Sequence, residues 1–345
     1  MTALGADWWN DSGSAEELQE AVGYGAVGGT SNPVIVMQAI KARPERYAPI
    51  IDRLLTEFAT DSEDEIAWRL IHQLATECAS KLSGVYNSTG GSKGFLSVQV
   101  SPKYYRNSAL MVSQAGRLAK LAPNIAIKAP ATDIGITAIE NMIAEGISIN
   151  ATVSFSVAQA VEVAKAIDRG MRRASSAGHD TNSIRTYVTL MVGRVDDHLK
   201  RVAEKEGIAY TPGLLDWAGI AVFKEAHRVF KAHGYKGTLL AAAYRHQGHW
   251  SELIGGDVLQ TIPYTWWTRF NLSGYTPVAR LDCPVDRMIV DELAAKFPDF
   301  NRAHDEEGMR PDEFVRYGAS SSTLQQFLGG YADLLVQVRN RMLQN

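Results

Sequence analysis

Short apolar runs alternate with longer amphipathic stretches along the chain, which predicts strands separated by helices. We expect eight strands, near residues 4–10, 25–31, 94–100, 124–130, 147–153, 186–192, 238–244 and 257–262. Strands that alternate with helices are typical of a parallel α/β fold. Eight of them favour a closed barrel, with an open sheet as the alternative. The pattern therefore predicts a single (β/α)8 TIM barrel whose core spans about residues 4–262.

Several helices are marked by start signals. Ser14 and Ser62 are each followed three residues later by a glutamate, which predicts capping boxes, and Asn32 precedes a proline at a first helical position. Three further segments are predicted: a long helical insertion over 36–58 and 62–82, a loop at 83–93, and a helical C-terminal extension over about 263–345. Together these elements are expected to form one domain, 1–345.

Within the expected strands, one set of alternate residues is aliphatic and the other is small or polar. If the aliphatic sets face the helices, the polar sets meet inside the barrel. In the seventh strand this places Leu240 and Ala242 toward the helices, and Ala241, Ala243 and then Arg245 on the inner side. Active sites of barrels are built at the carboxyl ends of the strands. The polar residues expected at these ends are Gln99, Lys128, Asn150, Thr152 and Arg245.

The composition argues against several classes of protein. The 345 residues carry a formal net charge of −3, which gives no basic footprint for nucleic acid or a membrane surface. The two cysteines, Cys78 and Cys283, lie far apart and form neither a disulfide framework nor a CxxC zinc pattern. No apolar run approaches the ~20 residues that span a bilayer, and the N-terminus lacks a signal-peptide pattern. A cytoplasmic protein without nucleic-acid or membrane partners is expected.

Lys128 lies in the apolar segment 124–132, which predicts a buried strand. Burial removes water from the ammonium group and lowers the pKa of a lysine. A neutral amine in a pocket is the nucleophile of Schiff-base chemistry with carbonyl substrates. The alternative is an edge strand from which Lys128 reaches water.

A Schiff-base lysine needs a group that moves protons and donors that hold the substrate. Asp11, at the end of the first strand, is the candidate for proton transfer, and Asp7 competes with it; a helix N-cap is the alternative role of either. Asn32, Asn150 and Thr152 are candidates to hold hydroxyl groups or a water. Structural hydrogen bonding is the alternative for these three, because buried polar groups are normally paired.

Arg194 and Arg245 follow the sixth and seventh strands and are the candidates for binding an anion. Two guanidinium groups at neighbouring strand ends suit a phosphate or another planar oxyanion. Pairing with Asp196 or Asp197 is the alternative role for these arginines.

Two other patterns point to a nucleotide site and a metal site, and neither context supports them. The glycines of 23–28 match GxGxxG, but they follow a helix and lead into a strand, which is the reverse of the dinucleotide-binding order. We interpret them as a helix C-terminal turn. His246 and His249 lack a third ligand in a recognised spacing, so no metal is expected.

Five segments, in order along the chain, resemble those of transaldolases. They are Gly-Thr-Ser-Asn-Pro (29–33), Ile-Lys-Ala-Pro-Ala-Thr (127–132), Ile-Asn-Ala-Thr-Val-Ser-Phe-Ser (149–156), Val-Gly-Arg (192–194) and Leu-Ala-Ala-Ala-Tyr-Arg (240–245). The resemblance runs from about residue 5 to the end and implies a (β/α)8 barrel without cofactor or metal. The roles that it implies are Lys128 as the Schiff-base lysine, Asp11 as the catalytic aspartate, Asn32 and Asn150 as substrate asparagines, Thr152 as the water-holding threonine, and Arg194 and Arg245 as phosphate arginines.

The chain also departs from the family pattern. Gln99 stands where transaldolases carry a glutamate, as it does in the related fructose-6-phosphate aldolase branch, and an amide does not titrate. Met191 stands where that branch uses a tyrosine. Thr189 and Ala243 stand where serines accompany the phosphate arginines, and 132–136 lacks the usual glutamate.

The resemblance implies a transaldolase-like transferase of carbohydrate metabolism and the pentose phosphate pathway. It would move a three-carbon ketol unit from a ketose phosphate to an aldehyde acceptor. One alternative is an aldolase that releases the unit, which Gln99 favours. A second alternative is a non-catalytic barrel that binds sugar phosphates. The expected partner is a sugar phosphate or related ketose, and a homo-oligomer is compatible with the sequence.

Overall fold

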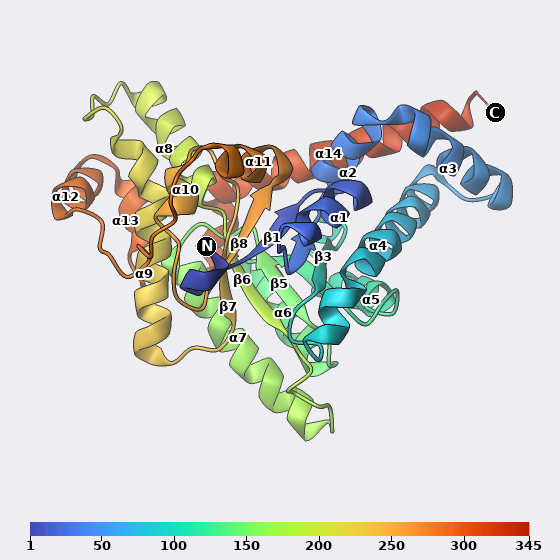
Figure 1. Cartoon of the computed structure of the whole chain (residues 1–345), viewed down its shortest axis with the longest axis horizontal. Coiled ribbons are helices and arrows are strands. Elements are labelled where there is room, and N and C mark those ends of the chain that lie inside the picture. Colours follow the sequence, from blue (N-terminus) through green and yellow to red (C-terminus); the bar gives the residue numbers. More distant parts are fainter. Residues whose placement is uncertain (345) are drawn as a thin grey trace.

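The computed structural model describes residues 1–344 and contains eight parallel strands that close into a barrel in chain order (Figure 1). The strands are β1 Asp7–Asp11, β2 Gly28–Thr30, β3 Phe95–Gln99, β4 Ile125–Pro130, β5 Ile149–Thr152, β6 Thr186–Leu190, β7 Thr238–Ala241 and β8 Leu259–Pro263. Pairing of β8 with β1 closes the sheet. The predicted (β/α)8 barrel is confirmed, and the open sheet is excluded.

Helices surround the barrel and extend beyond β8. They are α1 Ala15–Gly23, α2 Pro33–Ala42, α3 Pro44–Glu57, α4 Glu63–Ser88, α5 Ser108–Leu118, α6 Asp133–Ala144, α7 Val157–Ser176, α8 Val192–Glu206, α9 Ala218–His233, α10 Gly248–Ser251, α11 Tyr264–Leu272, α12 Arg287–Lys296, α13 Pro298–His304 and α14 Gly318–Met342. Short 3₁₀ turns are η1 Thr2–Leu4, η2 Pro102–Tyr104, η3 Leu214–Trp217 and η4 Pro311–Arg316. Residue 345, the end of the predicted extension, lies outside the described residues.

The helical insertion before β3 is longer than predicted. The expected loop at 83–93 is wrong in its first half, because α4 continues to Ser88. A Cβ on Gly84 would meet open space, so the helix passes this position without a steric conflict. The chain leaves the helix at Gly90 and Gly91, which have positive φ angles of 59° and 75°.

The predicted helix starts are largely confirmed. The Asn32 side chain accepts a hydrogen bond from the Ile35 N–H, and Ser62 forms a complete capping box with Glu65. At α1 the predicted box is incomplete. Ser14 caps the Glu17 N–H, but the Glu17 carboxylate accepts its hydrogen bond from Ser12 rather than from the Ser14 backbone.

Three aromatic side chains identify the inner face of the barrel. Trp9 of β1 and Phe95 of β3 both pack against Tyr187 of β6, with ring centroids 4.6 and 6.3 Å apart. These strands are not all neighbours, so the rings meet inside the barrel and fill its amino-terminal half. Residues two or four positions away from these rings along the same strands therefore also point inward. Among them are Asp11, Gln99 and Thr189, and by register Lys128 and Asn150.

The predicted orientation of β7 is wrong. Leu240 pairs in register with Thr189, an inward residue, so Leu240 shares the inner side and Ala241 faces the helices. The strand ends at Ala241, and Ala243 adopts a positive φ of 67°, which turns the chain out of the strand before Arg245. The aliphatic pattern predicted the wrong face because the side chain of β7 that faces the barrel interior is also apolar.

The C-terminal helix α14 packs against α2, α4, α8 and η2. Figure 1 shows α14 running alongside α2 across one end of the molecule. Because α2, α8 and η2 all follow carboxyl ends of strands, α14 covers the end of the barrel at which active sites are built.

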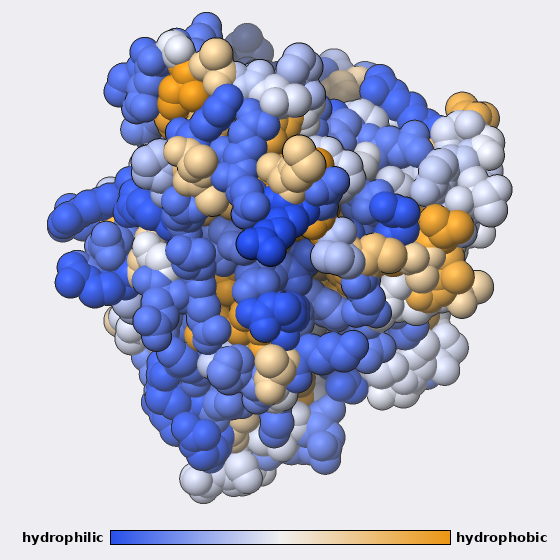
Figure 2. Space-filling model, turned by 90° about the vertical axis from the view of Figure 1, so that its left-hand side faces the viewer, coloured by the Kyte–Doolittle hydropathy of each residue, from blue (hydrophilic) through white to orange (hydrophobic). Residues whose placement is uncertain are grey.

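The surface in Figure 2 is mainly hydrophilic, with small separate apolar areas. Within residues 1–344, no helix has the length and apolar character needed to cross a membrane.

Candidate active site

Lys128 is buried inside the barrel, with 5% of its surface exposed. It lies between Gln99 of β3 and Asn150 of β5 in a closed sheet, so the edge-strand alternative is wrong. Among residues 1–344, no hydrogen bond or ion pair engages its Nζ. Burial lowers the pKa of Lys128, the positive charge of Arg194 lowers it further, and Asp11 partly opposes both. The amine is thus prepared to lose its proton.

Asp11 ends β1 on the same inner face as Lys128. Its carboxylate accepts a hydrogen bond from the Thr30 hydroxyl, and Thr30 Oγ1 lies 2.8 Å from Thr261 Oγ1. Burial raises the pKa of Asp11, while Lys128, Thr30 and Arg194 act in the opposite direction. A raised pKa brings the carboxyl group closer to the pH range in which it can both give and take a proton.

The alternative roles of the N-terminal aspartates are now distinguishable. Ser14, not Asp11, caps α1. Asp7 lies at the opposite end of β1, where it forms an ion pair with Lys93. Asp11 is therefore the aspartate that the fold brings to Lys128.

A polar row crosses β3, β5 and β6 inside the barrel. The Asn150 amide donates to Ser97 Oγ at 3.0 Å, and Thr189 Oγ1 donates to Asn150 Oδ1 at 2.7 Å. The structural alternative is thus observed for Asn150, and Thr189 contacts Asn150. Thr152 Oγ1 makes a weak contact of 3.9 Å to Met191 Sδ.

Asn32 caps α2 with its carbonyl oxygen, which is the structural alternative considered for it. Its amide nitrogen is a separate group with two N–H donors. The side chain can therefore cap the helix and still donate to a substrate hydroxyl.

The two arginines have different surroundings. Arg194, in the first turn of α8, keeps its buried Nε without a hydrogen-bond partner and lies 6.0 Å from the ring centroid of Phe327 on α14. Burial lowers the pKa of Arg194 to about 10, Arg245 contributes in the same direction, and Asp197 opposes. Arg245 instead forms an ion pair with Asp197 at 2.7 Å. Pairing with an aspartate is therefore observed for Arg245 and not for Arg194.

Buried polar atoms without partners gather at this end of the molecule. Those at the end of β3, after β3, β5 and β6, or on α14 are Gln99 Oε1, Ser101 Oγ, Ser154 Oγ, Arg194 Nε, Ser320 Oγ and Thr323 Oγ1. Buried polar groups normally have partners, so these atoms are free to bond to water or to polar groups of a ligand. Asp11 also lines a cavity of about 230 Å³ beside the ends of β1 and β8.

Sequence reasoning did not single out several residues of this region. Thr30, Ser97 and Thr261 hold Asp11 and Asn150, and the inward parity of their strands could have identified them. Phe327 had no comparable signal, because its contact with Arg194 depends on how α14 packs.

The glycine pattern at 23–28 ends α1 and leads into β2, which confirms it as a helix C-terminal turn. The structure adds Asp196 of α8 to His246 and His249, so that their potential ligand atoms lie within 4.8 Å of one another. The third partner comes from another element and was invisible as a sequence spacing.

Comparison with known proteins agrees with this geometry. A sequence model of the transaldolase/fructose-6-phosphate aldolase family matches residues 8–316. The transaldolase of Mycobacterium ulcerans is 31% identical over 241 residues, which cover 67% of this chain and 63% of that protein. The match therefore spans less than two thirds of that relative's length.

Other relatives align over almost their whole length. The transaldolase of Mycolicibacterium paratuberculosis is 27% identical over 367 residues, covering 99% of this chain and 96% of that protein. The transaldolase of Thiobacillus denitrificans is 27% identical over 366 residues, covering 98% of each. A barrel with a buried lysine on β4 and a family match over most of its length leads to one conclusion: the chain belongs to the transaldolase/fructose-6-phosphate aldolase family.

Proposed function

We propose that this protein is a transaldolase-type transferase that moves a three-carbon ketol unit from a ketose donor to an aldehyde acceptor. The observation that carries the proposal is the unpaired ammonium group of Lys128, buried inside the barrel. The family implies a ketose phosphate as donor, which is the starting expectation here.

In the proposed reaction, Lys128 Nζ attacks the donor carbonyl and the carbinolamine loses water to form an iminium ion. Asp11 takes the proton of the hydroxyl group two carbons from the iminium carbon. The C–C bond between the hydroxyl-bearing carbon and the carbon next to the iminium carbon then breaks, its electron pair forms an enamine, and an aldehyde leaves. The enamine attacks the acceptor aldehyde, and the acceptor oxygen takes a proton from Asp11. Hydrolysis of the new iminium ion frees Lys128 and the product.

The remaining side chains would position the reactants. We assign Asn32 and Asn150 to donor hydroxyl groups, with Thr189 orienting Asn150. Gln99 and Thr152 would hold the water of carbinolamine formation and hydrolysis. Arg194 and Arg245 would lie at the anionic end of the donor, with unpaired Arg194 the stronger site.

A second candidate, an aldolase, is favoured by Gln99. Its buried Oε1 has no hydrogen-bond partner, and its amide cannot titrate as the glutamate of transaldolases can. Protonation and release of the enamine, rather than transfer, would give aldolase activity.

A donor and acceptor assay tests the proposal. Fructose 6-phosphate with an added aldehyde acceptor should give a lengthened sugar, and without acceptor little free dihydroxyacetone should form. Lys128→Ala should abolish both products, while circular dichroism shows the fold unchanged. Retained turnover in a folded Lys128→Ala protein would contradict the proposal, whereas sugar-phosphate binding without turnover in the wild type would support a non-catalytic barrel.

The other expectations stay predictions. They are a single domain over 1–345, a cytoplasmic location, no nucleic-acid partner, neither cofactor nor metal, and a possible homo-oligomer.

A further inference from the structure

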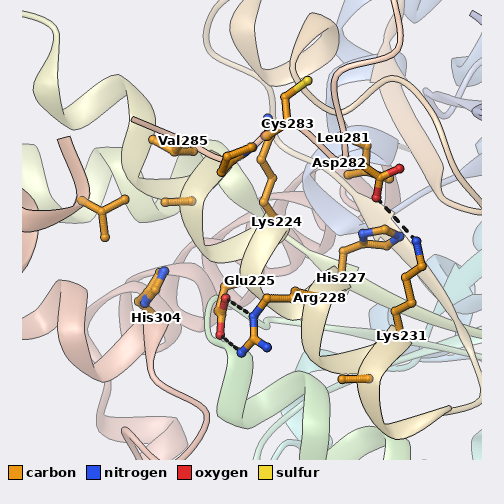
Figure 3. A pocket seen from close by; sticks show the side chains of 14 residues that line it. Lys224, Glu225, His227, Arg228, Lys231, Leu281, Asp282, Cys283, Val285 and His304 are labelled. Atoms are coloured by element: carbon orange, nitrogen blue, oxygen red, sulfur yellow. Dashed lines mark hydrogen bonds and ion pairs between the residues drawn. The ribbon is translucent and has the colours of Figure 1, made fainter. Parts of the chain in front are cut away.

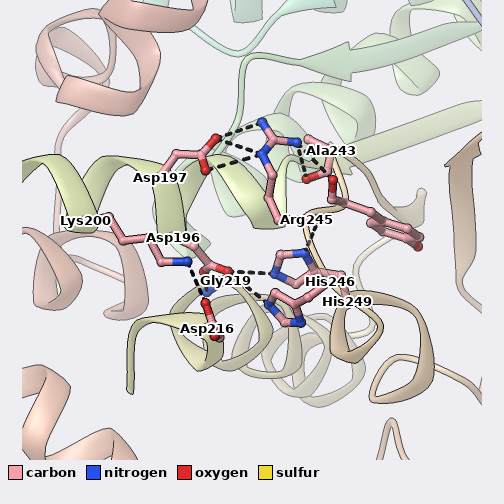
Figure 4. Close-up of polar contacts among 10 residues, drawn as sticks. Asp196, Asp197, Lys200, Asp216, Gly219, Ala243, Arg245, His246 and His249 are labelled. Atoms are coloured by element: carbon pink, nitrogen blue, oxygen red, sulfur yellow. Dashed lines mark hydrogen bonds and ion pairs between the residues drawn. The ribbon is translucent and has the colours of Figure 1, made fainter. Parts of the chain in front are cut away.

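The guanidinium group of Arg245 is almost fully occupied by groups of the protein itself (Figure 4). Its Nε and Nη2 donate to the Asp197 carboxylate at 3.0 and 2.7 Å. Its Nη1 donates to the carbonyl oxygens of Ala243 and Tyr244 at 3.1 and 3.0 Å. An arginine carries five N–H donors, so one Nη2 hydrogen remains for a ligand. Bidentate binding of a phosphate by Arg245 would require the Asp197 pair to open.

The loop that carries Arg245 is also fixed through its backbone. His249 Nδ1 accepts a hydrogen bond from the Arg245 N–H at 3.0 Å, so the proton of the neutral ring lies on Nε2 and is donated to Asp196 at 2.7 Å. Asp196 also accepts from the Gly219 N–H at 2.8 Å. Asp196 and its neighbour Asp197 thus hold the backbone and the side chain of Arg245 from one turn of α8.

These hydrogen bonds oppose metal binding by His249. The Nδ1 lone pair of His249 is committed to the Arg245 N–H, and its Nε2 carries the proton given to Asp196. Burial lowers the pKa of His249, which keeps the ring in this neutral form. A metal could bind His249 only by breaking one of the two hydrogen bonds.

Gly193 allows α8 to approach this loop. A Cβ at Gly193 would lie 2.1 Å from the Ala243 carbonyl oxygen and 2.8 Å from Arg245 Cγ. The absence of a side chain at this position therefore lets Asp197 reach Arg245. The ion pair thus depends on the glycine.

The ion pair with Asp197 reduces the positive charge that Arg194 and Arg245 together offer to an anion. Arg194 and Arg245 contribute two positive charges, and Asp197 removes one of them through its ion pair. The positive charges of Arg245 and Arg201 both lower the pKa of Arg194, so these groups share one electrostatic environment. A phosphomonoester carries about −1.5 to −2 charges near neutral pH, whereas a carboxylate carries one.

We propose that Asp197 is a specificity-determining residue that reduces the preference for phosphorylated donors. By occupying Arg245 it leaves Arg194 as the main anion-binding group, so the site accepts donors whose far end is a carboxylate or a hydroxyl about as well as those that end in a phosphate. This inference rests on the proposed function and refines its donor class.

A second two-pronged ion pair offers a matched control. Arg228 donates to Glu225 through Nε and Nη2, at 2.8 and 2.6 Å. The pair lies on α9 beside a cavity of about 530 Å³ that the segment 281–285 also lines (Figure 3). Glu225→Gln therefore removes one carboxylate from a similar pair without touching the barrel mouth.

The test compares kcat/KM for fructose 6-phosphate and for fructose in the wild type, Asp197→Asn and Glu225→Gln. In the wild type, the ratio of kcat/KM for fructose 6-phosphate to kcat/KM for fructose should be less than about ten. In Asp197→Asn the freed fork of Arg245 should raise this ratio by tenfold or more, since a charge-assisted hydrogen bond contributes about that factor. Asp197→Glu should return the ratio toward the wild-type value, and Glu225→Gln should leave it unchanged.

Each outcome decides the inference. A ratio that rises by less than about tenfold in Asp197→Asn, or a wild type that already prefers the phosphate more than about tenfold, overturns it; the second result needs no variant. Borohydride trapping of dihydroxyacetone on Lys128 involves no far-end group of the donor. It therefore distinguishes a failure of this inference from a failure of the proposed function. An adduct together with an unchanged ratio overturns this inference alone. No adduct in any of the proteins overturns the proposed function and the inference with it.

Discussion

A lysine buried without a hydrogen-bonded acidic partner lowers the stability of the fold that contains it. The folded-state pKa of Lys128 lies below its unfolded value because of burial. Between the two pKa values the unfolded chain binds more protons, so stability rises with pH through that window. Below the folded-state pKa the buried ammonium group lowers the free energy of unfolding by its full amount, about 1.4 kcal/mol for each unit of pKa difference. Retaining such a residue is understandable if its amine performs chemistry.

Replacing this lysine should therefore stabilise the protein. We expect Lys128→Met to raise the free energy of unfolding at neutral pH by about 1 kcal/mol or more, and the gain should shrink as pH rises. Denaturant unfolding at several pH values measures the difference. A variant less stable than the wild type at neutral pH would show that Lys128 contributes structurally instead.

Gln99 is predicted to influence the fate of the enamine. A glutamate at this position would supply a titratable group in place of the amide, whose buried Oε1 has no hydrogen-bond partner among the described residues. Gln99→Glu should raise transfer to the acceptor relative to release of dihydroxyacetone. The two products are quantified in one assay. A product ratio that does not move would remove Gln99 from the water-binding role.

Arg194 is predicted to provide most of the remaining affinity for an anionic donor end. Arg194→Ala should lower kcat/KM for fructose 6-phosphate by about tenfold, the lower end of the range for a lost charge-assisted hydrogen bond. The loss for fructose should be several-fold at most, and Arg194→Lys should restore part of the difference. Equal losses for both donors would exclude Arg194 from the anion site.

At the scale of the elements, the contact between α8 and the loop after β7 depends on a glycine. Gly193→Ala would place a Cβ against the Ala243 carbonyl oxygen, so we expect a loss of about 1–3 kcal/mol of stability. Gly116, in α5, has open space at its Cβ position and is the matched control. Gly116→Ala should stabilise the protein by about 0.5–1 kcal/mol, because alanine is the better helix former. Thermal unfolding of both variants measures these changes, and a neutral Gly193→Ala would contradict the close approach.

The strand pattern predicted these elements well where side chains alternate in polarity. The polar parity of β3, β4 and β5 correctly placed Gln99, Lys128 and Asn150 on one inner face. In β7 the interior side is occupied by Leu240, so hydrophobicity could not distinguish inside from outside. Ala243 adopts a left-handed conformation that its residue type does not signal, which hid the turn toward Arg245.

At the scale of the whole molecule, the closed barrel could be predicted because it follows from local periodicity repeated eight times. The cover formed by α14 could not. Phe327 reaches Arg194 from a distant part of the chain, and such a contact depends on how a helix packs rather than on its sequence period. The pairing of Asp197 with Arg245 was foreseen as an alternative, but only the structure shows which arginine is paired.

The most direct test of the account is borohydride trapping with dihydroxyacetone and with fructose 6-phosphate, followed by peptide mass spectrometry. The account predicts a stable adduct on the peptide that contains Lys128, and none in Lys128→Ala. An adduct on another lysine, or no adduct with either ketose in the folded protein, would contradict the assignment of Lys128 as the Schiff-base nucleophile.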